Sequence, residues 1–194
     1  MQQTVIGEDI ILPPNAGVEV FDGFALRFSE VVREAESAHY VEIRMGATTY
    51  RGISPRRSEW AYDRFSDLMG KKIIGVYDYF RKYEKGMPQG TFIHSDLGIS
   101  KWTAVLSLRN NNGAVAFWRH RASGSIAAGP WWRWEDAVSA QGFEESHWEM
   151  IGIVPLIENR CVVYPAALMH SRYPRDWQLD TPRAVQVFFF NEAE

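Results

Sequence analysis

The sequence has little of several features that would assign a protein to a class. Cys161 is the only cysteine among 194 residues, so an internal disulfide framework is excluded and a reducing compartment is expected. Acidic side chains outnumber basic ones by 24 to 21, and the net charge of -3 gives no overall attraction to nucleic acid or anionic lipid. The start of the chain has no basic n-region, and the longest apolar runs are far shorter than the ~20 residues of a membrane-spanning helix. We therefore expect a cytoplasmic protein with neither a nucleic-acid nor a membrane partner.

What the sequence does contain is material for a packed core. Hydrophobic residues make up 46% and aromatic residues 14% of the chain, which argues against disorder. The length and the absence of repeats predict a single domain over residues 1–194. Within it, residues 1–70 are expected to form a flanking α+β segment and residues 71–194 a β core, with an insertion at about 123–147.

Helical signals are confined to the first third of the chain. After a short strand at Val18–Phe21, Ser29 is expected to cap a helix that runs through Val31, Val32 and Ala35. A second helix is predicted over Ser58–Met69, where apolar residues recur at helical spacing and Gly70 follows as a stop.

Short strands dominate after Gly70. The runs are rich in β-branched and aromatic residues and are separated by turns that contain Gly or Asn. This pattern predicts a mainly β fold with flanking helices, a sandwich or barrel of the jelly-roll kind. The predicted strands are Lys72–Tyr83, Thr91–Asp96, Trp102–Leu108, Ala114–Arg119, Trp148–Leu156, Arg160–Tyr164 and Arg183–Phe190.

His94 and Asp96 are the first candidates for chemistry. In a strand, residues two apart point to the same face with Cα atoms roughly 6–7 Å apart, so this imidazole and carboxylate can converge on one metal ion. His170 is the natural third ligand. Two histidines and a carboxylate on one side of a metal leave three positions open, an arrangement suited to non-haem Fe(II). The alternative is that His94 and Asp96 form a satisfied polar pair in a turn.

Arg183 opens the last predicted strand. Alternation places it on the same face as Val185, Val187 and Phe189. A guanidinium on an apolar face is costly unless it meets an anion, and a bidentate carboxylate would satisfy it. The alternative is an arginine at a strand edge that reaches solvent.

From about Tyr77 to Asn191 the chain resembles the Fe(II)/2-oxoglutarate-dependent oxygenases of the prolyl-4-hydroxylase-like group. The resemblance rests on Arg81-Lys-Tyr-Glu-Lys-Gly86 followed by His94-Ser-Asp96, on the hairpin around Gly113, on Arg160-Cys-Val-Val-Tyr-Pro165, and on His170 and Arg183. The segment Phe117-Trp-Arg-His-Arg121 is most similar to an uncharacterised bacterial and phage branch of that superfamily.

The resemblance implies a double-stranded β-helix, a barrel of the cupin-like jelly-roll kind. It implies that His94, Asp96 and His170 bind iron and that Arg183 binds the distal carboxylate of 2-oxoglutarate. Tyr77, Tyr79 and Tyr83 share one face of the predicted strand, and one of them, with Tyr83 as the candidate, is expected to donate a hydrogen bond to that carboxylate. The alternative is that these tyrosines pack in the core. The resemblance further implies an O₂-dependent hydroxylase that acts on a small-molecule, amino-acid or peptidyl substrate and releases succinate and CO₂. Arg172 and Arg175 are less favoured as the carboxylate-binding arginine, because they precede an expected turn instead of lying in a strand.

Two branches of this superfamily are disfavoured by single positions. A halogenase would have a small residue in place of Asp96, to leave room for halide. A nucleic-acid demethylase would carry a second arginine six residues after Arg183, where this chain has Phe189.

Five of the eight tryptophans lie within or beside the expected insertion. We expect some of them to line the substrate pocket, with Trp118, Trp131 and Trp132 as the candidates. The equally weighted alternative is an aromatic cluster that anchors the insertion. Arg119, in the basic run Arg119-His-Arg121, is a further candidate for binding an anionic group of the substrate, and a solvated strand end is the alternative.

Two other functions remain open at the level of the sequence. One is a cupin-like metalloprotein, such as an isomerase or a dioxygenase that needs no cosubstrate, in which Arg183 would have no assigned anion. The other is a catalytically silent binding module, which would have no need of His94, Asp96, His170 and Arg183 together.

Overall fold

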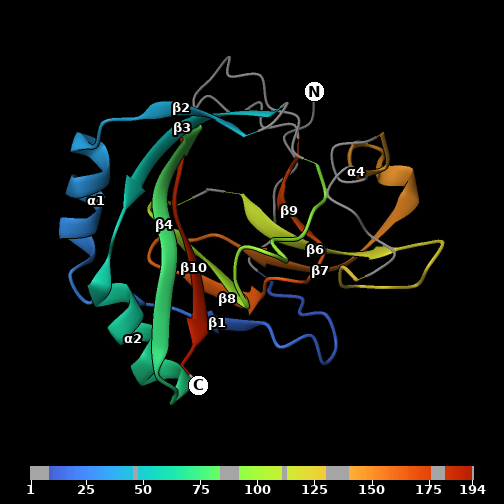
Figure 1. The fold of residues 1–194 in the computed structure, drawn as a ribbon, viewed down its shortest axis with the longest axis horizontal. Coiled ribbons are helices and arrows are strands. Elements are labelled where there is room, and N and C mark those ends of the chain that lie inside the picture. The colour runs from blue at the N-terminus through green and yellow to red at the C-terminus, as the bar shows by residue number, and fades with distance from the viewer. Residues whose placement is uncertain are drawn as a thin grey trace.

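The computed structural model of the protein describes residues 9–45, 48–83, 92–110, 113–129, 140–175 and 182–193. Ten strands dominate it, with two longer helices on one side (Figure 1). The strands are β1 (Glu19–Phe21), β2 (Val41–Met45), β3 (Thr48–Arg56), β4 (Ile73–Tyr83), β5 (Trp102–Ser107), β6 (Ala114–His120), β7 (Trp148–Pro155), β8 (Cys161–Pro165), β9 (His170–Tyr173) and β10 (Arg183–Glu192). The helices are α1 (Phe28–Ser37), α2 (Glu59–Met69), the short α4 (Ala140–Phe143) and a 3₁₀ turn at Glu145–His147. No helix in these ranges is long and apolar enough to span a membrane.

The strands form two antiparallel sheets. The larger sheet has the order β1-β8-β5-β10-β4-β3-β2 and the smaller one the order β7-β6-β9. Strands that follow one another in the chain are thus often separated in the sheets, and β10, the last strand, lies between β5 and β4 (Figure 1). This is a mainly β jelly-roll fold with flanking helices, as the strand pattern predicts.

Alternation along the central strands divides the larger sheet into two faces. On β10, Ala184, Phe188 and Phe190 belong to a buried cluster that also includes Phe65 of α2. The intervening Val185 packs in a second cluster that includes Val115 of β6 and Val154 of β7, from the smaller sheet. One face of the larger sheet is therefore covered by the helices, while the other faces the smaller sheet and encloses the cavity described below.

A buried polar network joins α2 to the sheet. Asp78 on β4 is fully buried, and its carboxylate accepts hydrogen bonds from the backbone N–H and the hydroxyl of Ser58 and from the hydroxyl of Tyr62. The side-chain amide of Gln186 on β10 donates to the same carboxylate and to the Ser58 hydroxyl. Because Ser58 precedes the first turn of α2, the carboxylate binds the N-terminus of this helix, where partial positive charge favours an anion.

Asp78→Ala is expected to destabilise the fold by about 3 kcal/mol or more, because it leaves several buried donors without an acceptor. Chemical denaturation of the variant should show a lower midpoint. Asp63→Ala, which removes an exposed carboxylate from the same helix, serves as the control and should leave the midpoint unchanged. Equal midpoints for the two variants would mean that the network contributes nothing.

The helices and most strands lie close to where the sequence predicts them, with three differences. The first helix begins at Phe28 with Arg27 at its N-cap, so Ser29 is not the capping residue. The predicted strand over Thr91–Asp96 is reduced, among the described residues, to a single bridge between His94 and His170. Strands β2 and β3 were not predicted.

Pro55 explains why β3 is hard to recognise, because a proline in a run of residues argues against a central strand. In the structure, the pairing of β2 with β3 extends only to Val41 opposite Ile53. Pro55 lies beyond that point, where it is paired with β4 alone and its missing N–H has no ladder partner to lose.

Candidate active site

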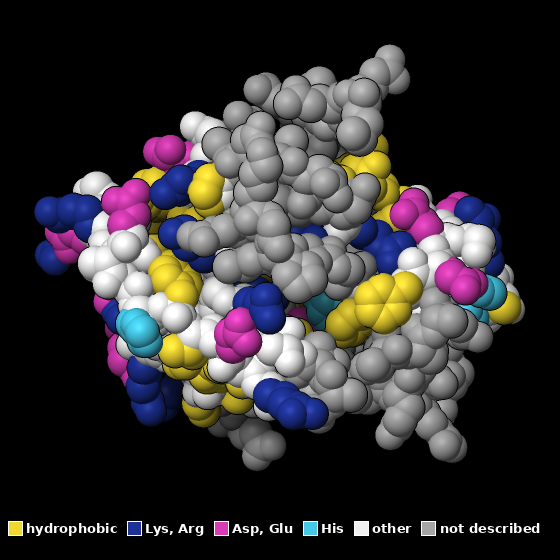
Figure 2. All heavy atoms as spheres, turned by 90° about the horizontal axis from the view of Figure 1, so that it is seen from above, with side chains coloured by type: hydrophobic (Ala, Val, Ile, Leu, Met, Phe, Trp, Pro, Cys, Tyr) yellow, Lys and Arg dark blue, Asp and Glu magenta, His cyan; other side chains and the backbone are white. Residues whose placement is uncertain are grey.

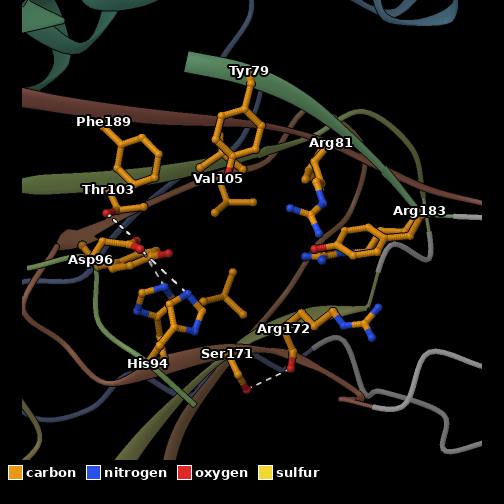
Figure 3. Close-up of a pocket in the computed structure, with 16 residues that line it drawn as sticks. Tyr79, Arg81, His94, Asp96, Thr103, Val105, Ser171, Arg172, Arg183 and Phe189 are labelled. Atoms are coloured by element: carbon orange, nitrogen blue, oxygen red, sulfur yellow. Dashed lines mark hydrogen bonds and ion pairs between the residues drawn. The ribbon is translucent and has the colours of Figure 1, made fainter. Parts of the chain in front are cut away.

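A cavity lies between the two sheets and is lined from both of them. Its two ends differ chemically: His94 and Asp96 lie at one end, and Arg81, Arg172 and Arg183 lie at the other (Figure 3). The described lining residues are Tyr79, Arg81, Tyr83, His94, Asp96, Thr103, Val105, Val115, Tyr164, His170, Ser171, Arg172, Arg183, Val185, Val187 and Phe189. In the space-filling view, histidine and acidic side-chain atoms are visible near the centre of the face, and basic side chains lie on both sides of them (Figure 2).

His94, Asp96 and His170 form a compact set of potential metal ligands. One ligand atom from each lies within 4.8 Å of the other two. Asp96 Oδ2 is 3.3 Å from His170 Nε2, and Asp96 Oδ1 is 3.8 Å from His94 Nε2. Asp96 and His170 are buried, and His94 is largely so. The structure thus brings together three residues that are separated by as many as 76 positions in the chain.

Backbone hydrogen bonds place the two histidines side by side. The N–H of His94 donates to the carbonyl of His170 at 3.0 Å, and the N–H of His170 donates to the carbonyl of His94 at 2.8 Å. This reciprocal pairing makes them direct neighbours in an antiparallel bridge, with side chains on the same face. Their ring centroids are 4.5 Å apart. The N–H of Asp96 donates to the carbonyl of Ala166, which ties the loop that carries the carboxylate to the end of β8.

The local contacts of the imidazoles select the ring nitrogen that faces the site. His94 Nδ1 lies 3.0 Å from the carbonyl oxygen of Phe92, and His170 Nδ1 lies 2.9 Å from that of Leu168. A proton on Nδ1 of each ring is donated to the carbonyl oxygen. The lone pair of Nε2 is then available to a metal ion on the side where Asp96 lies. Burial, together with the neighbouring His170, lowers the pKa of His94 to about 4, so the ring is neutral near pH 7. Both features are those of a metal-binding histidine.

Asp96 is held as a carboxylate. Burial by itself would raise its pKa, but the nearby His170 and His94 and a hydrogen bond from Thr103 lower it overall. Thr103 Oγ1 donates to Asp96 Oδ2 at 2.9 Å. Thr103 lies on β5 opposite Phe189 of β10, so the carboxylate is positioned from the larger sheet.

The other end of the cavity is strongly cationic. The guanidinium carbons of Arg81, Arg172 and Arg183 lie 4.7, 4.8 and 5.3 Å from the ring centroid of Tyr83. Burial would raise the pKa of Tyr83, but these three charges and a hydrogen bond from Arg183 lower it overall. Figure 3 shows Arg81 and Arg183 at the end of the cavity opposite His94 and Asp96.

Comparisons with known proteins place the fold. No family model and no curated protein matches the sequence. Among solved structures, the epimerase SnoN, crystallised with Fe³⁺, alpha-ketoglutarate and nogalamycin RO, matches with a TM-score of 0.59 and 14% identity over 91% of this chain and 79% of its own. HygX from Streptomyces hygroscopicus, with nickel, 2-oxoglutarate and hygromycin B bound, has a TM-score of 0.56 and 13% identity over 90% of this chain and 82% of its own. A prolyl hydroxylase from Trichoplax adhaerens, in complex with a peptide, has a TM-score of 0.56 and 11% identity over 91% and 84%.

The chain has the fold of the Fe(II)/2-oxoglutarate-dependent oxygenases. At these levels of identity the likeness concerns the fold, and SnoN shows that one of its members is an epimerase. In this oxygenase fold the described structure places Tyr83 and Arg183 at the cationic end of the cavity. It also puts Arg183, Val185, Val187 and Phe189 on one cavity face, as the alternation of the last strand predicts.

The prediction that Arg172 precedes a turn instead of lying in a strand was wrong. Arg172 lies within strand β9 and lines the cavity, because the short strand continues past His170 before the turn begins. Arg175 lies beyond this strand and donates to the carbonyls of Gly142 and Phe143, away from the described lining.

The expected substrate residues are not brought to the cavity in the described part of the fold. Trp118 is buried against Ile93, Trp148 and Met169, and its indole N–H donates to Ser171 Oγ at 3.0 Å. Arg119 forms a half-exposed ion pair with Glu149. Trp131 and Trp132 lie outside the described residues. The packing of Trp118 with Trp148 resembles the aromatic-cluster alternative more than a substrate surface.

Several lining residues were not singled out by the sequence, namely Arg81, Thr103, Tyr164 and Ser171. Arg81 had a detectable signal, because it shares a strand face with Tyr79 and Tyr83. Tyr164 had none, since its role depends on β8 pairing with β5, which places it opposite Thr103 and brings its ring centroid to 4.7 Å from that of His170.

Proposed function

We propose that the protein is an Fe(II)- and 2-oxoglutarate-dependent dioxygenase that hydroxylates a small-molecule, amino-acid or peptidyl substrate. The observation that carries this proposal is the pairing of two sites in one cavity. A set of two imidazoles and a carboxylate lies at one end, and a buried arginine, Arg183, lies at the other. An oxygenase of this kind needs both, since its cosubstrate joins the metal to a cation.

The donor set fits iron. Two imidazole Nε2 atoms and one carboxylate suit Fe(II), and three ligands on one side of an octahedral ion leave three positions for cosubstrate and O₂. His94, His170 and Asp96 would hold the ion, and the hydrogen bonds to Phe92, Leu168 and Thr103 keep the three ligands oriented. Iron and 2-oxoglutarate together supply the oxidation of the substrate by O₂, with succinate and CO₂ as coproducts.

Arg183 fits the distal carboxylate of 2-oxoglutarate. It is 4% exposed and stands opposite Tyr83 in the pairing of β10 with β4. A planar guanidinium binds a carboxylate through two parallel N–H groups, and burial strengthens this pair. We infer that the hydroxyl of Tyr83, which interacts with Arg183, donates to the same anion.

The walls between the two ends contribute by excluding water. Val105, Val115, Val187 and Phe189 line the cavity and offer no polar groups to a bound ligand. A dry, apolar wall strengthens the electrostatic interactions at both ends and protects a reactive centre from side reactions. Behind His94, Phe143 contacts Phe92, whose ring centroid lies 4.9 Å from that of His94.

The test is an anaerobic titration. Fe(II) and then 2-oxoglutarate are added to the purified protein, and a visible metal-to-ligand charge-transfer band is expected. Iron binding without such a band would favour the cupin-like alternative, and the absence of both would favour a silent binding module. Either result, obtained with folded protein, would refute the proposal.

Thr103→Val is expected to weaken iron binding by roughly tenfold or more, because it removes the hydroxyl that orients Asp96 while keeping the side-chain shape. Competition with a chelator gives the affinity. Thr103→Ser, which retains the hydroxyl, should restore most of it. Equal iron affinity in all three proteins would show that the hydrogen bond does not position the carboxylate.

A further inference from the structure

The cavity carries more positive charge than the proposed cosubstrate requires. Among its described lining residues, three are arginines and only Asp96 is acidic. When 2-oxoglutarate is bound as proposed, its first carboxylate meets the metal and its distal carboxylate meets Arg183. Of the other two arginines, Arg172 donates to the carbonyl of Arg175, and Arg81 has no assigned anion.

Arg81 is close to Arg183 but is not equivalent to it. In the pairing of β4 with β10, Tyr83 is opposite Arg183 and Arg81 is opposite Val185. The backbone of Arg81 is therefore two residues, or roughly 7 Å, closer to the end where Thr103 pairs with Phe189 and binds Asp96. Along the paired strands β4 and β10, Arg81 is thus the nearer of the two arginines to the metal-ligand end of the cavity.

The surroundings of Arg81 hold it in place without neutralising it. Its guanidinium carbon lies 5.5 Å from the ring centroid of Tyr50 and 4.7 Å from that of Tyr83, so aromatic rings from β3 and β4 flank it. Its Nε is buried and has no hydrogen-bond partner in the described structure. The described residues also offer it no carboxylate within ion-pair distance. A buried donor of this kind is costly until an acceptor binds.

We propose that Arg81 binds an anionic group, a carboxylate or a phosphate, on the primary substrate. This inference rests on the proposed function and narrows its substrate class to molecules that carry negative charge. The two rings orient the guanidinium plane, and the anion satisfies the buried Nε. Arg81 and Arg183 then each meet one negative charge, one from the substrate and one from the cosubstrate.

The first arm of the test separates the two arginines by their effect on 2-oxoglutarate, measured by anaerobic titration of the charge-transfer band. Arg183→Gln should weaken 2-oxoglutarate binding by about 30-fold or more, as expected when a buried charge pair loses one member. Arg81→Gln should weaken it by only about threefold, the effect of a more distant charge. Lys82→Gln is the matched control, since it removes the same charge from the next residue of β4, whose side chain lies over the ring of Tyr40.

The second arm measures whether the loaded site takes another anion. Inorganic phosphate and acetate are titrated into the Fe(II)- and 2-oxoglutarate-loaded protein without O₂, by calorimetry and by the shift of the visible band. Wild type and Lys82→Gln should bind at least one anion, and Arg81→Gln should bind it about tenfold more weakly. A preference for acetate or for phosphate distinguishes the two chemistries.

Three results would overturn the inference: a loss of 2-oxoglutarate affinity in Arg81→Gln as large as in Arg183→Gln, no binding of either anion by the loaded wild type, or an anion affinity of loaded Arg81→Gln equal to that of wild type. The first would assign Arg81 to the cosubstrate. Failure of the proposed function is a different result, because then wild type with bound iron would give no charge-transfer band at all.

Discussion

Asp96→Ala is expected to abolish iron binding and succinate formation. Asp96 is the only anionic member of the ligand set, and it lies between the two imidazoles, 3.3 Å from His170 Nε2 and 3.8 Å from His94 Nε2. Losing a residue that only orients a ligand typically weakens metal binding by about 10- to 100-fold, so losing the charged ligand itself should exceed ~100-fold. Iron affinity by chelator competition and succinate release in the presence of 2-oxoglutarate are the two measurements.

The matched control is Asp63→Ala, which removes an exposed carboxylate on α2 and should change neither quantity. Circular dichroism of both variants establishes that they are folded. Normal iron binding and normal turnover of 2-oxoglutarate by Asp96→Ala would show that the ligand assignment is wrong.

Arg183→Gln is expected to raise the 2-oxoglutarate requirement by about 30-fold or more while iron still binds. The physical reason is burial: Arg183 is 4% exposed, so the distal carboxylate would enter a site where water no longer screens the pair. Arg183→Lys keeps the charge but loses the planar fork, and it should fall between wild type and Arg183→Gln.

A second cosubstrate tests whether Arg183→Gln weakens the binding of the distal carboxylate alone or of the whole cosubstrate. A 2-oxo acid without a distal carboxylate, such as 2-oxobutyrate, should bind wild type and Arg183→Gln equally weakly. Arg109→Gln, which removes a half-exposed arginine paired with Glu36, should leave the affinity for 2-oxoglutarate unchanged. If Arg183→Gln bound 2-oxoglutarate as tightly as wild type, Arg172 or Arg81 would be the arginine that holds the carboxylate.

Local spacing in the sequence predicts which side chains share a strand face, and this part of the site was predictable. The face of β10 that carries Arg183, Val185, Val187 and Phe189 is an example, because alternation in a strand depends only on backbone geometry. The prediction that His94 and Asp96 lie close together was also correct, although the strand expected to carry them is only a bridge at His94. There the loop after the bridge, tied by the N–H of Asp96 to Ala166, brings the carboxylate back to the histidines.

The residues that sequence reasoning missed are those whose role depends on distant pairing. Thr103 reaches Asp96 only because β5 lies next to β10 and β8 in the larger sheet. Trp118 was expected near the substrate, but on β6 it shares a face with Ala116 and packs in the cluster of Trp148, while Val115 and Phe117 pack on the opposite face. Alternation predicts that Trp118 and Ala116 share a face, but which face of β6 looks into the cavity depends on how the two sheets pack.

By itself, then, the sequence determined the fold class, the set of candidate ligands and the cavity face of the last strand, because these follow from alternation and side-chain chemistry over a few residues. Only the tertiary structure decided that His170 stands beside His94, that Arg172 and Arg81 join Arg183 around Tyr83, and that Trp118 packs in a core. The reason is physical: these contacts join strands from different parts of the chain, and the order of those strands is set by how the two sheets bury their apolar faces together.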